Sequence, residues 1–195
     1  MLQGGIVVET ITAEQAVKDA QGLTFEKVWA ALMETKALQD KTQKQIDEVS
    51  KTVGGLGNSI GRLTEALFSA ELVKKFNDIG YPFTKEGRNT KFRENGIVIA
   101  EADFFLENGD FVMPVEVKTD LTIRYVDRHL ERISKIRRYM DIGCDNRKII
   151  GAVAGGFVPE SVLSHAQENG LFVVVQTGDS VAIADSPAGF TLQEW

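Results

Sequence analysis

The chain contains one cysteine, Cys144, among its 195 residues, and two histidines. A single cysteine excludes an internal disulfide and is typical of a reducing cytosol. Neither His129 nor His165 has the Cys or His neighbours, at the usual spacing, of a zinc site. No Lys-Ser or Lys-Thr pair follows Gly155-Gly156, so these glycines predict a simple turn and not a phosphate-binding loop.

Long apolar runs are also missing. No window approaches the ~20 apolar residues that a membrane-spanning helix needs. The first residues, MLQGGIVVETIT, contain no basic residue, and their apolar run is too short for a signal peptide. We therefore expect a soluble, cytoplasmic protein without a membrane partner.

Basic residues are outnumbered. There are 22 Lys and Arg against 28 Asp and Glu, which gives a net charge of -6. The composition is 43% hydrophobic and 26% charged, as in globular proteins. Because the whole molecule would repel nucleic acid, such a partner requires a local basic patch.

A heptad pattern begins at Phe25 and continues through a highly charged segment. Its positions alternate steps of three and four residues: Phe25, Val28, Leu32, Thr35, Gln39, Thr42, Ile46, Val49, Val53, Leu56, Ile60, Leu63 and Leu67. This spacing predicts a long coiled-coil helix that self-associates through residues 25–53, with a dimer as the expected state. The polar positions Thr35, Gln39 and Thr42 weaken the seam. The alternative is an exposed single helix that docks on its own domain.

Two domains are predicted, a helical arm over residues 1–57 and a compact domain over residues 58–195. A capping box at Thr12 predicts a short helix over residues 13–20 of the arm. Near the boundary, glycines interrupt the heptad pattern at Gly54, Gly55, Gly57 and Gly61. Since each glycine costs a helix about 1 kcal/mol, they predict a hinge or a close helix crossing.

The compact domain is expected to be a mixed α/β sandwich. The pattern predicts a helix to Gly80, then strands over 90–93, 96–107 and 110–119, a helix over 122–141, a strand over 148–155, a helix over 159–170, and strands over 171–178 and 180–185. The Asn-Gly pairs at Asn95-Gly96 and Asn108-Gly109 indicate two hairpins.

Charged residues gather in the second hairpin, EADFFLENGDFVMPVEVK. A two-residue turn at Asn108-Gly109 would place Glu101 opposite Glu116, and Asp103 opposite Pro114. Directly facing residues share one face of a sheet, as do residues two apart on one strand. The charges expected on one face are Glu101, Asp103, Glu116 and Lys118.

Three neighbouring carboxylates repel one another unless they share a proton or a cation neutralises them. Mg²⁺ (or Mn²⁺) suits such a site, because it prefers hard oxygen ligands completed by water and phosphate oxygens. A lysine beside the ion can orient or help to deprotonate a water molecule for attack on phosphorus. The alternative is that Glu116 and Lys118 form an ordinary surface ion pair.

The helix, the hairpin and the sequence VEVKT together resemble the PD-(D/E)XK nuclease superfamily, with its αβββαβ restriction-endonuclease-like core. The charged N-terminal helix is similar to that of RecB-family-like predicted nucleases with coiled-coil segments. The resemblance implies that Asp103, Glu116 and the Val117 carbonyl bind the metal ion, that Lys118 is the catalytic lysine, and that Glu65 is an accessory acid and a further candidate ligand.

Two positions depart from this family. Ala102 stands before Asp103 in place of proline. Tyr139 follows Lys135, where RecB-type nucleases have a Gln-x-x-x-Tyr motif. These departures concern contacts with the substrate and whether the site is active.

Basic residues follow helical spacing after the predicted lysine. The candidates for binding nucleic acid are Arg124, Arg128, Arg132, Lys135 and Arg138. A basic stripe beside a metal site can hold phosphates. Asp127 and Glu131 dilute it, and a solvated amphipathic face is the alternative.

The sequence therefore predicts a magnesium-dependent nuclease that acts on DNA and dimerises through a coiled coil. The alternatives are a catalytically silent nucleic-acid-binding protein, and a coiled-coil scaffold whose domain binds another protein.

Overall fold

The structure is a computed structural model that describes residues 12, 14, 17–18, 22 and 24–195. Most of the helix predicted over 13–20 and most of the N-terminal segment lie outside these residues. The helices are α2 (Phe25–Asp78), α3 (Ile123–Ile142) and α4 (Glu160–Glu168). The strands are β1 (Lys85–Glu94), β2 (Ile97–Glu107), β3 (Phe111–Asp120), β4 (Lys148–Ile149), β5 (Ala152–Phe157), β6 (Phe172–Thr177) and β7 (Ser180–Ile183).

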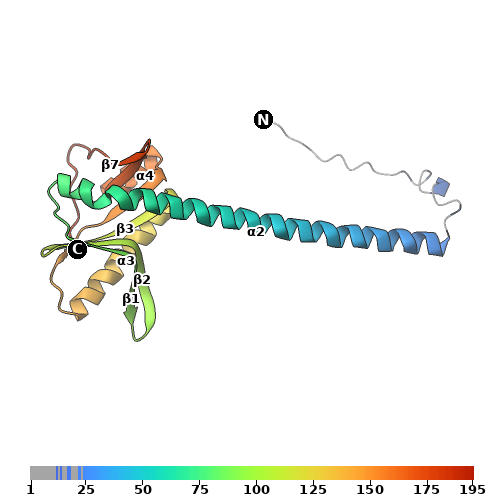
Figure 1. Cartoon of the computed structure of the whole chain (residues 1–195), viewed down its shortest axis with the longest axis horizontal. Helices are drawn as coiled ribbons and strands as arrows, with labels where there is room; N and C mark the ends of the chain where they lie inside the picture. The colour runs from blue at the N-terminus through green and yellow to red at the C-terminus, as the bar shows by residue number, and fades with distance from the viewer. Residues whose placement is uncertain (1–11, 13, 15–16, 19–21, 23) are drawn as a thin grey trace. The chain divides into compact units, whose positions relative to one another are not determined.

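The strands form one mixed sheet in the order β1-β2-β3-β5-β6-β7, with β4 also paired to β3. The pairs β1–β2, β2–β3 and β6–β7 are antiparallel, whereas β3–β5 and β5–β6 are parallel. The helices α3 and α4 cover one face (Figure 1). The predicted α/β class is confirmed.

Two buried clusters lie on opposite faces of the sheet. One contains Val126, Ile133 and Ile136 of α3, together with Val112 and Val153 of the sheet. The other contains three fully buried residues near the end of α2, packed against β2, β3, β5 and β6: Phe68, Leu72 and Phe76. The sheet is thus covered on both faces, which explains why β5 and the first part of β6 are apolar on both sides.

The chain divides into two compact units, residues 1–55 and 56–195. The long N-terminal helix is confirmed, but α2 continues through all four glycines without interruption. A Cβ atom added at Gly54, Gly55, Gly57 or Gly61 would meet nothing within 4 Å, so α2 has no close helix crossing at these four glycines. Helix propagation on both sides outweighs the local cost of glycine.

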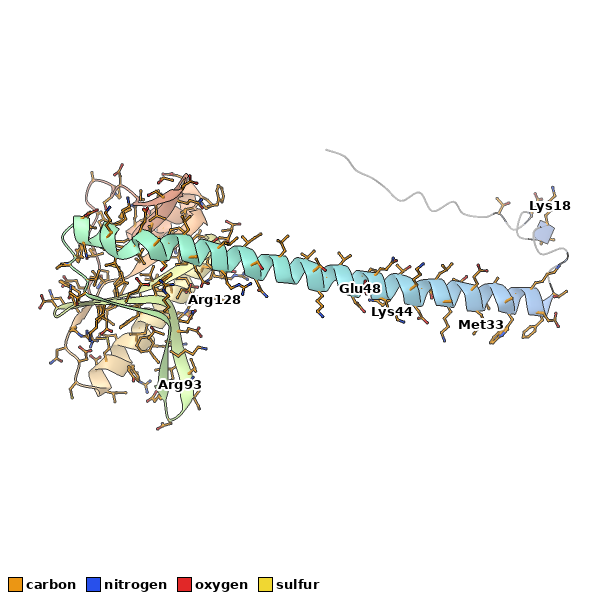
Figure 2. All side chains as sticks on the ribbon, in the orientation of Figure 1. Lys18, Met33, Lys44, Glu48, Arg93 and Arg128 are labelled. Atoms are coloured by element: carbon orange, nitrogen blue, oxygen red, sulfur yellow. The ribbon has the colours of Figure 1, made fainter. Side chains whose placement is uncertain are left out.

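The apolar heptad positions of the arm are exposed. Between Phe25 and Leu56 their exposed fractions range from 41% at Val28 to 77% at Phe25. Neighbouring side chains such as those of Met33, Lys44 and Glu48 also project from the surface of α2 (Figure 2). No helix of the described chain is long and apolar enough to cross a membrane.

Only one of the two predicted Asn-Gly turns occurs at its expected position. Asn95 and Gly96 join β1 to β2 with positive φ values of 50° and 82°, as a two-residue hairpin turn requires. In the next hairpin, the Asn108 side chain instead accepts hydrogen bonds from the backbone N–H groups of Asp110 and Phe111, at 2.9 and 2.6 Å. The turn therefore begins one residue later than predicted.

This shift corrects the predicted register. Phe105, and not Asp103, lies opposite Pro114, and Phe104 lies opposite Val115. Continuing the register by one residue brings Asp103 opposite Glu116. A displaced turn centre moves the register by two residues, so side chains keep their faces but change their partners.

The strand predicted over residues 148–155 is divided into β4 and β5 around Gly151. A Cβ atom at Gly151 would lie 2.5 Å from the Leu171 side chain and 2.6 Å from that of Ile133. The glycine thus lets α3 and the start of β6 approach this part of the sheet closely.

His129 lies in the core and is only 1% exposed. Its Nε2 lies 3.2 Å from the Pro114 carbonyl oxygen, to which it donates, and its Nδ1 has no partner among the described residues. Burial lowers the pKa of His129 to about 4. Because it is buried, His129 is not placed to contact a substrate.

This histidine makes the fold sensitive to acid. The unfolded chain binds the proton near the ordinary value of 6.5, whereas the folded chain binds it only near 4, so stability is complete above pH 6.5 and falls towards pH 4. We expect a loss of about 3 kcal/mol from His129 over this range. His129→Gln keeps a donor for Pro114 and does not titrate, so its unfolding free energy should change less with pH. Urea unfolding of both proteins at several pH values tests this, and equal pH slopes would contradict it.

Candidate active site

The candidate site lies where β2 and β3 separate. Their paired residues end at Phe104 and Val115, and β3 continues as the neighbour of β5. Beyond this point the Val117 N–H donates to Oδ2 of Asp103 at 2.8 Å. The Asp103 carboxylate thus takes the place of a backbone acceptor and fixes its own position against β3.

Three oxygen atoms converge on the ammonium group of Lys118. Nζ lies 3.1 Å from Asp103 Oδ2, 2.8 Å from Glu116 Oε1 and 2.8 Å from the Val117 carbonyl oxygen. These atoms belong to the residues that the family resemblance assigned to the metal ion. The ammonium group occupies the position that a metal ion would take among these oxygens. Two carboxylates and a carbonyl are donors of the kind that suit a hard divalent ion.

Glu116 is the most enclosed charge of the site, and its side chain is 2% exposed. Arg132 of α3 binds Glu116 through both terminal nitrogens of its guanidinium group, with Nη2 at 3.1 Å from Oε1 and Nη1 in contact with Oε2. Arg132 Nη1 also donates to the Glu101 carbonyl oxygen at 3.4 Å. Two carboxylates, Asp103 and Glu116, are therefore neutralised by two cations, Lys118 and Arg132.

These surroundings shift the pKa values of Asp103 and Glu116 in opposite directions. Burial raises the pKa of Asp103, and the adjacent Glu116 charge raises it further. Burial would also raise the pKa of Glu116, but hydrogen bonds from Arg132 and Lys118 hold it below its ordinary value. Although burial opposes its charge, the pKa of Lys118 is raised by Glu116 and Asp103, so this side chain retains its proton.

Glu65 approaches from α2 but remains outside the pair. Partial burial raises its pKa, and the charge of Asp103 adds to the effect. Within the part of the chain that the structure describes, no three His, Cys, Asp or Glu side chains are grouped closely enough to hold one metal ion. The neighbouring Thr64 hydroxyl lies 3.1 Å from that of Thr119, which ties α2 to the strand just beyond Lys118.

Glu101, expected on the same face, has a different role. Its carboxylate pairs with Lys91 of β1 at 3.8 Å, and its backbone carbonyl accepts from Arg132. Its carboxylate is therefore not among the oxygens that converge on Lys118.

The predicted basic stripe of α3 is divided by the structure. Arg124, Arg128 and Lys135 are exposed, as Figure 2 shows for Arg128. Arg138 is exposed and pairs with Glu94 at 3.5 Å. Arg132 instead points into the carboxylate pair.

A cavity of about 300 Å³ lies between the β1–β2 hairpin and α3, lined by Glu94, Val98, Ile99, Lys135, Arg138, Tyr139 and Ile142.

Sequence reasoning did not identify Arg132 as part of the carboxylate site. A signal was present, because Arg132 is three residues after the buried His129 and four before the buried Ile136. This position borders the buried stripe of α3, where a long side chain can reach inward. Thr64 gave no comparable signal.

Comparisons with known proteins give one partial likeness of fold. No family model matches the chain, and no curated protein matches it. The chain is similar to the small subunit of the heterodimeric restriction endonuclease R.BspD6I, at 15% identity and a TM-score of 0.33. The match covers 55% of this chain and 61% of that subunit. At a TM-score of 0.33 this likeness establishes neither a fold, a family nor an activity.

Proposed function

We propose that this chain is a metal-dependent nuclease of the PD-(D/E)XK type that hydrolyses phosphodiester bonds of DNA. One observation carries the proposal: oxygens of Asp103, Glu116 and Val117 converge within 3.1 Å on one ammonium group. A site that gathers hard oxygen donors around a cation, next to a lysine, suits metal-assisted hydrolysis.

In this scheme Asp103, Glu116 and the Val117 carbonyl hold Mg²⁺ or Mn²⁺, with Glu65 as a nearby acid. The bound ion supplies Lewis-acid polarisation of a phosphoryl oxygen and of a water molecule. Asp103 is held in place by the Val117 N–H. Because the pKa of Lys118 is raised, Lys118 acts as a donor that orients the water molecule or steadies developing charge, and not as the base.

The nucleic-acid surface is proposed on α3. Arg124, Arg128 and Lys135 are exposed on the helix that also supplies Arg132 to the site. They form a local basic surface on a chain whose net charge is -6. Exposed cations spaced along one helix can bind successive phosphates and release counterions.

The second candidate function is a catalytically silent, nucleic-acid-binding or scaffold protein that retains the fold. The observation that favours it is the saturation of Glu116, whose two oxygens are already paired with Arg132 and Lys118. A self-neutralised site of this kind is complete without a metal ion.

Self-association is proposed through α2, by pairing with a second copy of the chain. Within residues 25–53 the apolar heptad positions are exposed, and a stripe with this spacing is buried in coiled coils. The flanking residues are highly charged, which suits the solvent-facing positions of such a pair.

Three substitutions test the cleavage scheme. Asp103→Asn removes a charged ligand, so Mn²⁺ affinity and DNA cleavage should fall together. Lys118→Ala should lower the cleavage rate by about 10²–10⁴, while Mn²⁺ binding persists or tightens because a competing charge is gone. Glu101→Gln is the control and should have little effect, since that carboxylate pairs with Lys91. Calorimetry and a cleavage time course measure both properties. A wild-type protein that binds no divalent ion and cuts nothing would leave the silent alternative.

A charge-matched pair of triple variants tests the basic surface. Replacing Arg124, Arg128 and Lys135 together by Gln should weaken DNA binding and reduce the slope of log affinity against log salt. The reduction should be about 0.9 per lost phosphate contact for duplex DNA. The control replaces three lysines of the arm by Gln: Lys36, Lys41 and Lys44. An equal loss of DNA affinity in both variants would show that α3 is not the binding surface.

Polar substitutions on α2 test the dimer. Ile46→Asp with Val49→Asp places charges within the heptad series and should convert a dimer into a monomer in sedimentation velocity. Leu38→Asp is the control, because Leu38 is 58% exposed and apolar but lies outside the series. A wild-type chain that is monomeric at micromolar concentration would refute the proposal.

A further inference from the structure

Arg132 occupies both oxygens of the most buried carboxylate in the site. Its guanidinium contacts Glu116 Oε1 and Oε2 and the Glu101 carbonyl, and its side chain is 24% exposed. Bidentate pairing of this kind is among the strong forms of charge-assisted hydrogen bond. The geometry thus places a fixed positive charge on an acid that the proposed function assigns to the metal ion.

The metal-free site is already electrically balanced. Lys118 and Arg132 together carry two positive charges, which match those of Asp103 and Glu116. A divalent ion that entered this arrangement would add two positive charges beside two others, and it would compete for the same Glu116 oxygens. One resident cation must therefore move before Glu116 can bind the ion.

Arg132 is the cation that reaches the site from a separate element. Lys118 and Arg132 each contact three oxygens, and their side chains are 29% and 24% exposed. Lys118 follows Glu116 and Val117 on the same strand, whereas Arg132 comes from α3. Its neighbours at helical spacing, Arg128 and Lys135, are exposed to solvent, so a released guanidinium would join them on the basic surface.

We propose that Arg132 is a resident counter-cation of Glu116 that a divalent ion displaces, and that the released guanidinium then binds a phosphate of the nucleic acid. This inference rests on the proposed function. It makes Arg132 a positioning residue that lowers the metal affinity of the empty site. It also couples the two ligands, because each raises the affinity for the other by the same factor.

The first test is a calorimetric titration of the metal-free, full-length protein with Mn²⁺. Arg132→Gln should bind Mn²⁺ at least about tenfold more tightly than wild type, since one unit charge at contact distance is removed. Arg132→Lys keeps the charge but not the bidentate geometry, so its affinity should be intermediate. Arg93→Gln, which removes an exposed arginine of β1 outside the proposed site, should bind as wild type does. A purely structural role for Arg132 would leave Mn²⁺ affinity unchanged or weaken it.

The second test measures the coupling. The probe is a fluorescent twelve-nucleotide thymidine strand, whose binding is followed by anisotropy with EDTA and with Ca²⁺, and whose integrity is checked on a gel. Wild type and Arg93→Gln should each bind it more tightly with Ca²⁺, whereas Arg132→Gln should lose that gain.

The outcomes separate the two proposals. If wild type binds Mn²⁺ and both Arg132 variants bind it equally or more weakly, the counter-cation role is overturned while the nuclease proposal stands. If none of the proteins binds Mn²⁺, the proposed function fails and this inference fails with it. Melting curves without metal identify any variant that does not fold, and the Arg132→Lys result then decides.

Discussion

The hydrogen bond from the Val117 N–H to the Asp103 carboxylate is the interaction on which the candidate site depends. Val117 is 2% exposed, and a buried N–H without an acceptor costs about 1–3 kcal/mol. Where β3 leaves β2, the strand loses its backbone acceptor on that side, and a side-chain oxygen replaces it. The two strands can therefore separate inside a sheet that is covered on both faces, which opens the space that Glu116 and Lys118 share.

The electrostatic arrangement follows from this opening. Asp103 and Glu116 are brought together in a partly buried place, where neither can be ionised at low cost unless a cation is present. Two cations from different elements meet this requirement, Lys118 from β3 and Arg132 from α3. Even so, the pKa of Asp103 remains raised, so its ionised form opposes folding at neutral pH. A carboxylate with a raised pKa is more typical of a functional site than of a stabilising ion pair.

The elements of the compact unit were predictable because each depends on local chemistry. An Asn-Gly pair with two left-handed residues specified the β1–β2 hairpin, although β1 begins at Lys85, five residues before the predicted strand. The predicted register of the second hairpin was wrong because the Asn108 side chain accepts hydrogen bonds within the turn. Sequence pattern alone does not distinguish such a turn from a two-residue turn at Asn108-Gly109. Periodicity likewise predicted α2, but four glycines suggested a break that the helix does not contain.

The site was predictable in part. The spacing of Glu116 and Lys118 is local, and the family resemblance supplied Asp103; the structure brings these three together. Glu101 and Arg132 were assigned incorrectly. The partner of the Glu101 carboxylate depends on how β1 pairs with β2. Arg132 borders the buried stripe of α3, but its contact with Glu116 depends on how α3 meets β3. Arg132 was grouped with the surface cations because its spacing matches theirs, whereas a small difference in angle around the helix turns it inward.

Asp103 is both a proposed metal ligand and the acceptor for the Val117 N–H, and this limits which substitutions the chain can accumulate during evolution. A change to an apolar residue would remove an acidic ligand and also orphan the Val117 N–H, so the same step would weaken the sheet. Lys118 donates to the Val117 carbonyl oxygen, but its loss would leave no buried backbone N–H without an acceptor. A lineage under no selection for hydrolysis would therefore lose Lys118 before Asp103. Where the aspartate did change, asparagine, which retains the acceptor, would be the residue most easily tolerated.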